Sequence, residues 1–295
     1  MTQVRVFLLL LGLMVGLGAA TEVSAQTIKV GSKNFTEQYI MAEIYAAALE
    51  NAGIKVERKI NLGGTLIAHK ALTTGEIDVY PEYTGTGLSS VLKAETMSDP
   101  KAVYEKVKAF YEEQFKCTWL TPTALNSSYA MAVRPETAEK YGLKTLSDLA
   151  KVAKDLTIGG GPEFPDRKDG LPGLKAVYGI EFKEFRQFAK LALRYDALAA
   201  GQIEVANGVT TDWQIVTQKF VVLADDKGLF PPYYAAPVIR QAVLADNPKI
   251  AETLNAVSAL IDTATMRQLN AKVEVDKDEP KDVARAFLKE KGLIK

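Results

Sequence analysis

The residues with the clearest chemical character are tyrosines and hydroxyl side chains at the end of an apolar run. That run leads from Ile77 and Val79 into Tyr80-Pro81-Glu82-Tyr83-Thr84-Gly85-Thr86. The pattern predicts a strand that Pro81 turns out of the sheet, followed by a turn in which glycine lets the backbone approach a ligand. Aromatic faces beside hydroxyls suit a small cation with an apolar coat. A packed tyrosine-rich turn is the alternative that this stretch alone leaves open.

Catalytic chemistry needs a nucleophile with a base, a pair of carboxylates or a metal cluster, and the sequence has no recognisable motif of these kinds. His69 is the one histidine, in a helical pattern, and Cys117 is the one cysteine. Cys117 has no disulfide partner and is predicted to be a small buried hydrophobe. One residue of each type makes a transition-metal site improbable. We expect no catalytic residues, metal or cofactor, and an exported enzyme is the alternative from another class.

The charge balance also limits the partners. The 295 residues include 36 Lys and Arg against 36 Asp and Glu, so the formal net charge is zero. This gives no electrostatic reason to expect nucleic acid or an anionic membrane surface as a partner. The length exceeds what one small core usually organises, which favours two lobes.

The first residues are typical of a secretory signal. Arg5 precedes an apolar run from Val6 to Ala20, and Val23-Ser24-Ala25 follows as a small-residue cleavage site. We therefore predict a signal peptide over 1–25 and a periplasmic location. A membrane anchor is the alternative, but glycines interrupt the run and it ends at the cleavage pattern.

The elements that must position these side chains alternate between strands and helices. Residues 28–30 and 56–60 are predicted strands, and helices follow each of them. The turn 31–37 starts the first helix, with Asn34 as its cap and Glu37 completing a capping box. The order βαβαβ implies a largely parallel sheet with a ligand cleft beyond the carboxyl ends of its strands. Lys33 and Tyr83 both lie at such ends.

An internal repeat indicates that a second lobe is built like the first. Residues 71–79, ALTTGEIDV, are echoed by residues 197–205, ALAAGQIEV, at an offset of 126. Residues 28–31 are loosely echoed by 156–159. Continuing the 126-residue offset pairs Tyr83 with Val209, so the second lobe has an aliphatic side chain where the first has a ring.

Two polar and aromatic segments mark where the chain is expected to cross between lobes. Tyr129 follows Asn126-Ser127-Ser128, and Tyr233 follows Pro231-Pro232. Arg167 lies just beyond the glycine-rich loop 159–162. These positions predict lobe I as residues 26–127 plus 233–295, and lobe II as residues 128–232.

Together these side chains suit a zwitterion that carries a methylated nitrogen. A quaternary ammonium has no N–H to donate, so ring faces must hold it, at roughly 0.5–2 kcal/mol per favourable ring. A carboxylate on the same ligand requires a lysine or an arginine.

Four stretches resemble the substrate-binding proteins of osmoprotectant ABC transporters, which take up glycine betaine, choline and carnitine. They are GSKNFTEQ at 31–38, GEIDVYPEYTGT at 75–86, PEF at 162–164 and DDKGLFPPY at 225–233. The resemblance extends over essentially all of the chain after residue 25. It implies an α/β two-lobed periplasmic binding protein fold of type II with a ligand cleft between the lobes. It also implies a quaternary-amine ligand in an aromatic cage, delivered to a membrane permease driven by a separate ATPase. We expect the protein to act as a monomer.

The resemblance also assigns roles to individual residues. Tyr83, Tyr129 and Tyr233 match cage residues, and Lys33, Thr86 and Arg167 match the groups that hold the carboxylate. The sequence departs from the family pattern at Val209, where related sequences commonly carry an aromatic residue. The missing ring is expected either to weaken betaine binding or to widen the pocket for a bulkier betaine. A carrier for another solute, such as an amino acid, is the further alternative.

Overall fold

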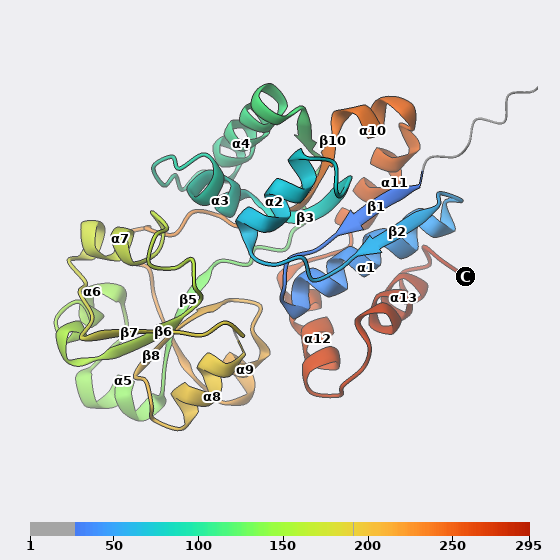
Figure 1. The fold of residues 1–295 in the computed structure, drawn as a ribbon. Helices are drawn as coiled ribbons and strands as arrows, with labels where there is room; N and C mark the ends of the chain where they lie inside the picture. Colours follow the sequence, from blue (N-terminus) through green and yellow to red (C-terminus); the bar gives the residue numbers. More distant parts are fainter. Residues whose placement is uncertain (1–26, 191) are drawn as a thin grey trace, which may run out of the picture.

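The protein, in a computed structural model that describes residues 27–190 and 192–295, contains two five-stranded sheets (Figure 1). The predicted signal peptide, residues 1–25, lies outside the described residues. Within the described ranges, no helix is both long and apolar enough to cross a membrane.

Lobe I is the part of the chain built around the first sheet. Its strands lie in the order β2-β1-β3-β10-β4. β1 pairs in parallel with β2 and β3, whereas β10 is antiparallel to β3 and β4. The elements are β1 (Ile28–Gly31), α1 (Thr36–Asn51), β2 (Val56–Lys59), α2 (Thr65–Thr73), β3 (Val79–Tyr83), α3 (Thr84–Thr86), α4 (Pro100–Phe115), β4 (Cys117–Trp119), β10 (Ala235–Arg240), α10 (Gln241–Asp246), α11 (Lys249–Ser258), α12 (Thr263–Glu274) and α13 (Pro280–Glu290).

Lobe II is built around the second sheet, whose strands lie in the order β7-β6-β8-β5-β9. β6 is parallel to β7 and β8, and β5 is antiparallel to β8 and β9. Its elements are β5 (Tyr129–Val133), α5 (Pro135–Tyr141), α6 (Leu146–Leu149), β6 (Thr157–Gly160), α7 (Leu171–Gly173), β7 (Glu184–Gln187), α8 (Leu193–Ala199), β8 (Val205–Val209), α9 (Trp213–Thr217) and β9 (Val221–Leu223).

The two sheets repeat one pairing scheme. The 126-residue offset of the sequence repeat relates β3 at 79–83 to β8 at 205–209, because 79 plus 126 is 205. Each of these strands lies between a parallel neighbour, β1 or β6, and an antiparallel one, β10 or β5. The expected α/β fold with two lobes of like construction is therefore confirmed.

The chain passes between the lobes twice, and the two crossings are hydrogen-bonded to each other. One crossing lies between β4 and β5, and the other between β9 and β10. The Ser127 amide donates to the Tyr233 carbonyl at 3.1 Å, and the Tyr233 amide donates to Oδ1 of Asn126 at 2.8 Å. The arrangement of the two sheets supports lobe boundaries that fall within these crossings. The exact boundaries, between residues 127 and 128 and between residues 232 and 233, stay a prediction.

The predicted end of the third strand was wrong. β3 continues through Pro81 to Tyr83. Pro81 stands opposite Pro237 on β10, and neither residue has an N–H to donate. The two missing N–H groups therefore fall at the same pair, and Pro81 does not interrupt the pairing of the strands at a second position. The longer strand carries Tyr83 to the carboxyl edge of the sheet.

The predicted capping box at the first helix was also wrong. α1 begins at Thr36, its N-cap residue is Phe35, and no side chain caps it. The Glu37 carboxylate turns inward and accepts a hydrogen bond from Tyr83 instead. Glu37 therefore bonds to Tyr83, which is distant in sequence, and not to the start of its own helix.

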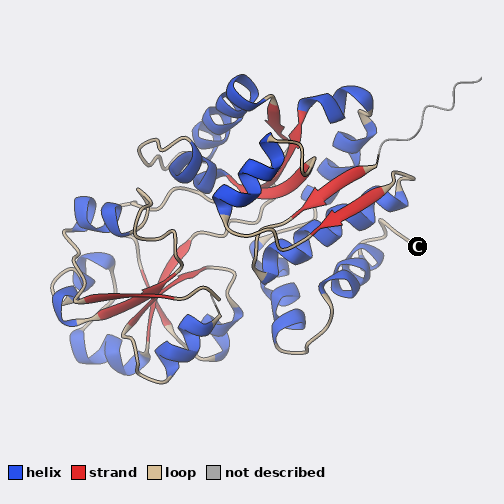
Figure 2. Ribbon diagram, in the orientation of Figure 1, coloured by secondary structure: helices blue, strands red, loops and turns tan. Residues whose placement is uncertain are grey.

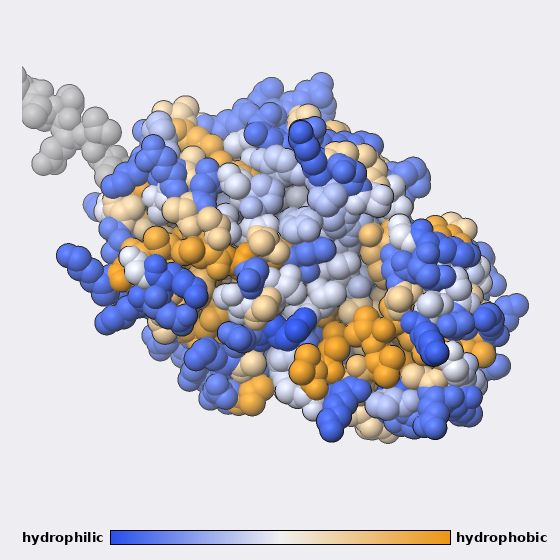
Figure 3. All heavy atoms as spheres, turned by 180° about the vertical axis from the view of Figure 1, so that it is seen from behind, coloured by the Kyte–Doolittle hydropathy of each residue, from blue (hydrophilic) through white to orange (hydrophobic). Residues whose placement is uncertain are grey.

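Helices cover both faces of each sheet and bury an apolar core against it (Figure 2). Cys117 is a free, buried thiol, and His69 packs against Tyr111 and Phe115. Seen from behind, the surface is largely hydrophilic, with separate hydrophobic patches over both lobes (Figure 3).

Candidate functional site

A cavity of about 550 Å³ lies between the lobes and is lined by residues of both. All six candidate residues line it, although they come from segments up to 200 positions apart. They are Lys33, Tyr83, Thr86, Tyr129, Arg167 and Tyr233. Val209 lines the same cavity. The fold thus gathers around one cavity the residues that the sequence named from distant segments.

Tyr129 lies at the centre of an aromatic cluster. Its ring centroid is 5.3 Å from that of Tyr233, 5.6 Å from Phe164 and 5.5 Å from Phe230. The guanidinium of Arg167 lies over the Tyr129 ring, 5.3 Å from its centroid. This end of the cavity therefore combines ring faces with a base.

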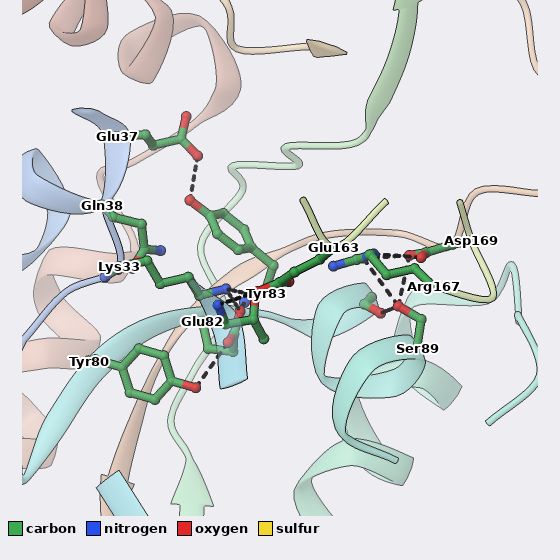
Figure 4. Close-up of polar contacts among 12 residues, drawn as sticks. Lys33, Glu37, Gln38, Tyr80, Glu82, Tyr83, Ser89, Glu163, Arg167 and Asp169 are labelled. Atoms are coloured by element: carbon green, nitrogen blue, oxygen red, sulfur yellow. Dashed lines mark hydrogen bonds and ion pairs between the residues drawn. The ribbon is translucent and has the colours of Figure 1, made fainter. Parts of the chain in front are cut away.

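Tyr83 belongs to a different aromatic group. Its ring stacks on Phe35 with centroids 6.4 Å apart, and its hydroxyl donates to Oε1 of Glu37 at 2.6 Å (Figure 4). Among the described residues, it forms no aromatic ring pair with Tyr129 or Tyr233. The three predicted cage tyrosines thus line one cavity as two groups, with Phe35 as an additional ring.

Lys33 is an ion-paired side chain and not an isolated base. It is 3% exposed, and its Nζ lies 2.5 Å from Oε1 of the fully buried Glu82. The same nitrogen donates to the Thr65 hydroxyl at 3.3 Å, and Tyr80 donates to the other Glu82 oxygen (Figure 4). Glu82 therefore neutralises the positive charge of Lys33 within the cavity wall, and the attraction of Lys33 for a ligand carboxylate is weaker.

Arg167 keeps one guanidinium nitrogen available. Nε and Nη2 donate to the two oxygens of Asp169 at 2.7 and 2.6 Å, and Nη2 also lies 3.2 Å from the Ser89 hydroxyl (Figure 4). Nη1 makes no hydrogen bond to any described residue. Although burial opposes the charge of Asp169, the adjacent Arg167 holds the pKa of that carboxyl below its ordinary value. The hydroxyl of Tyr233 also donates to Asp169.

Thr86 and Val209 complete the set of predicted positions. Thr86 is buried and lines the cavity at the end of α3. Val209 is the last residue of β8 and stands opposite Tyr129 in the pairing with β5. The position that lacks a ring is therefore the cross-strand neighbour of a predicted cage tyrosine.

Sequence reasoning missed several polar residues that line the cavity. They are Glu37, Glu163, Arg194, Asp212 and Asn270. Glu37 was assigned to a helix cap, and Glu163 was noted only as part of a motif. The pairing of Arg194 with Asp212 at 2.7 Å, and the reach of Asn270 from α12, depend on contacts between segments that no local pattern reveals.

Hydrogen bonds between the lobes join them directly. The Thr65 amide at the start of α2 donates to Oε1 of Glu163 at 2.9 Å. Ser89 donates to Asp169 at 2.7 Å, and Nη2 of Arg267 donates to the Thr210 carbonyl at 2.6 Å. The carboxylate of Glu163 therefore sits at the positive end of a lobe I helix. In this structure the two lobes are therefore in direct contact.

Comparisons with known proteins agree with this arrangement. A glycine-betaine-binding protein of Pseudomonas aeruginosa is 37% identical over 95% of this chain and 92% of its own length. A carnitine transport binding protein of Listeria monocytogenes is 36% identical over 95% of this chain and 90% of its own. A solved structure described as a glycine betaine/carnitine/choline ABC transporter superposes with a TM-score of 0.74 at 34% identity, and covers 90% of this chain and 99% of its own.

The family model for the substrate binding domain of the ABC-type glycine betaine transport system matches residues 26–290, nearly all of the described chain. Both relatives are named as binding proteins, and the name of the Listeria protein includes carnitine transport. The chain therefore belongs to the family of substrate-binding domains of ABC-type glycine betaine transport systems.

Proposed function

We propose that this protein is the solute-binding component of an ABC importer, and that it binds a quaternary ammonium osmoprotectant such as glycine betaine. The observation that carries this proposal is the convergence of Tyr83, Tyr129 and Tyr233 on one interlobe cavity. Ring faces attract a methylated ammonium that cannot donate a hydrogen bond. The free Nη1 of Arg167 suits the ligand carboxylate, with Thr86 and Lys33 in supporting positions.

The partners and location follow from the same proposal. The closed, liganded form is recognised by a membrane permease, which a separate cytoplasmic ATPase drives. The protein acts as a monomer in the periplasm and releases its ligand unchanged. Membership of a transport family supports this reading over that of an exported enzyme.

Calorimetric titration tests the ligand directly. Glycine betaine, choline, carnitine, proline betaine and bulkier betaines should include at least one ligand that binds at a single site, whereas unmethylated glycine and proline should not bind. Tighter binding of the unmethylated compounds would favour an amino-acid carrier. The absence of heat and of thermal stabilisation with every methylated amine would remove the proposal. Mass spectrometry should recover the ligand unchanged after prolonged incubation.

A bulkier betaine is the second candidate, and the size of the cavity favours it. A volume of about 550 Å³ is larger than a short trimethylated amino acid requires, and pockets of this size hold drug-sized ligands. Val209, the cross-strand neighbour of Tyr129, lines the cavity with a side chain smaller than an aromatic ring. A ligand series of increasing bulk separates the candidates, because affinity should rise with size if the space is used.

A further inference from the structure

The buried bases of the cavity wall are already neutralised by the protein. Within the described ranges, three buried bases line the cavity, and each is paired with a carboxylate. The pairs are Lys33 with Glu82 at 2.5 Å, Arg167 with Asp169 at 2.6 Å and Arg194 with Asp212 at 2.7 Å. Their charges cancel over short distances, so they leave little net field in the cavity.

Glu37 is a buried carboxylate of the same wall that has only neutral partners. It is 3% exposed, and its two oxygens accept hydrogen bonds from the Tyr83 hydroxyl at 2.6 Å and the Asn270 amide at 3.2 Å. It forms no ion pair with any residue that the structure describes. Burial raises its pKa, and the hydrogen bonds from Tyr83, Thr211 and Asn270 offset that rise only in part, while the charge of Asp212 adds to it.

An unmatched buried carboxylate is costly unless a positive charge comes close to it. The hydrogen bond from the Tyr83 hydroxyl to Glu37 also increases the electron density of a ring that lines the cavity. Both effects favour a ligand with a permanent positive charge. Choline and the betaines carry such a charge, and it does not depend on pH.

We propose that Glu37 is the counter-charge for the ligand cation, and that it makes the cavity select a fixed positive charge over a neutral group of the same shape. This inference rests on the proposed function and extends it to a residue that the cage and carboxylate roles do not include. The competing view is that Glu37 only holds Tyr83 in place, in which case ligand charge is irrelevant to its effect.

Isosteres that lack the positive charge separate these two roles. In 3,3-dimethylbutan-1-ol a carbon replaces the nitrogen of choline, and 3,3-dimethylbutanoate is the same replacement for glycine betaine. Titration gives the affinity ratio of each cation to its isostere. In the wild-type protein that ratio contains the contributions of both the rings and Glu37.

The Glu37→Gln variant preserves size and removes the charge. We expect it to lower the cation-to-isostere ratio by at least about tenfold and to leave the affinity for the uncharged 3,3-dimethylbutan-1-ol nearly unchanged. Glu43→Gln is the matched control, because Glu43 is a buried glutamate on the same helix that pairs with Arg58 and does not line the cavity. The control should leave the ratio unchanged.

Equal losses of cation and isostere in Glu37→Gln, or no loss of either, would overturn the role of Glu37 and leave the proposed function standing. Failure of the wild-type protein to bind any methylated amine would overturn both. If Glu37→Gln does not fold, Glu37→Asp and Glu37→Asn make the same comparison at equal length. The ratio should then be higher for Asp, and equal ratios would contradict the inference.

Discussion

At the scale of single residues, the cavity is defined by which charges are matched and which positions carry rings. Lys33 is matched by Glu82, whereas one nitrogen of Arg167, beside the Tyr129 ring, makes no hydrogen bond to a described residue. Val209 adds an aliphatic surface where the equivalent position of lobe I has Tyr83. Three predictions follow from these environments.

Adding a ring at Val209 should strengthen the cage. Val209→Tyr is expected to tighten the binding of glycine betaine about tenfold, because one additional ring contributes roughly 1.4 kcal/mol. Calorimetry measures the change, and Val209→Leu controls for added bulk without a ring. Equal effects of the two substitutions, or an unchanged affinity in a folded Val209→Tyr variant, would show that the position does not contribute to the cage.

Removing Arg167 should harm carboxylated ligands selectively. Arg167→Ala is expected to lower the affinity for glycine betaine at least about tenfold more than that for choline, which has no carboxylate. Because the variant leaves Asp169 buried without its base, the titrations are repeated with Asp169→Asn in the same chain. Equal losses for the two ligands would remove Arg167 from the carboxylate role.

The raised pKa of Glu37 makes its effect on stability depend on pH. A carboxyl with a higher pKa in the folded state stabilises the fold most below its unfolded pKa, and this contribution is lost as pH rises through the folded pKa. Without ligand, Glu37→Gln should therefore gain stability relative to the wild type as pH rises. Denaturant unfolding at several pH values measures the difference, and a difference that is constant with pH would contradict the assignment.

At the scale of elements, the buried ion pair joins three parts of lobe I. Lys33 lies in the turn between β1 and α1, Glu82 lies on β3, and Thr65 begins α2. The pair therefore fixes the carboxyl ends of two strands against the start of a helix, which is where the cavity opens.

Breaking this pair should destabilise the lobe. Glu82→Gln leaves Lys33 buried without its carboxylate and is expected to cost about 3–5 kcal/mol of unfolding free energy. Denaturant unfolding without ligand measures this loss of unfolding free energy. Glu57→Gln breaks an exposed pair with Lys59 on the same sheet and should have little effect. A small loss for Glu82→Gln would mean that Lys33 finds another partner.

At the scale of the whole molecule, the cavity is lined by residues of both lobes, and hydrogen bonds join the lobes directly. Glu163 on lobe II accepts the Thr65 amide of lobe I, and further hydrogen bonds join the lobes through Asp169 and Thr210. A ligand that contacts both lobes favours this arrangement over an open one.

Ligand binding should therefore make the protein more compact in solution. The radius of gyration from small-angle scattering is expected to fall on addition of a saturating methylated amine, because closure brings the lobes together. The same concentration of sucrose controls for osmolality. A ligand that binds by calorimetry without changing the radius of gyration would contradict a ligand-driven closure.

The sequence by itself determined the α/β alternation, the two like lobes and six of the residues that line the cavity, because apolar periodicity, the repeat and the motifs are local properties of the chain. The tertiary structure alone decided that β3 runs through Pro81, that Tyr83 groups with Phe35, that Lys33 is matched by Glu82, and that Glu37 faces inward to Tyr83 and Asn270. The partners of a buried charge come from segments distant in sequence, since burial forces each polar group to pair with whatever the fold places beside it.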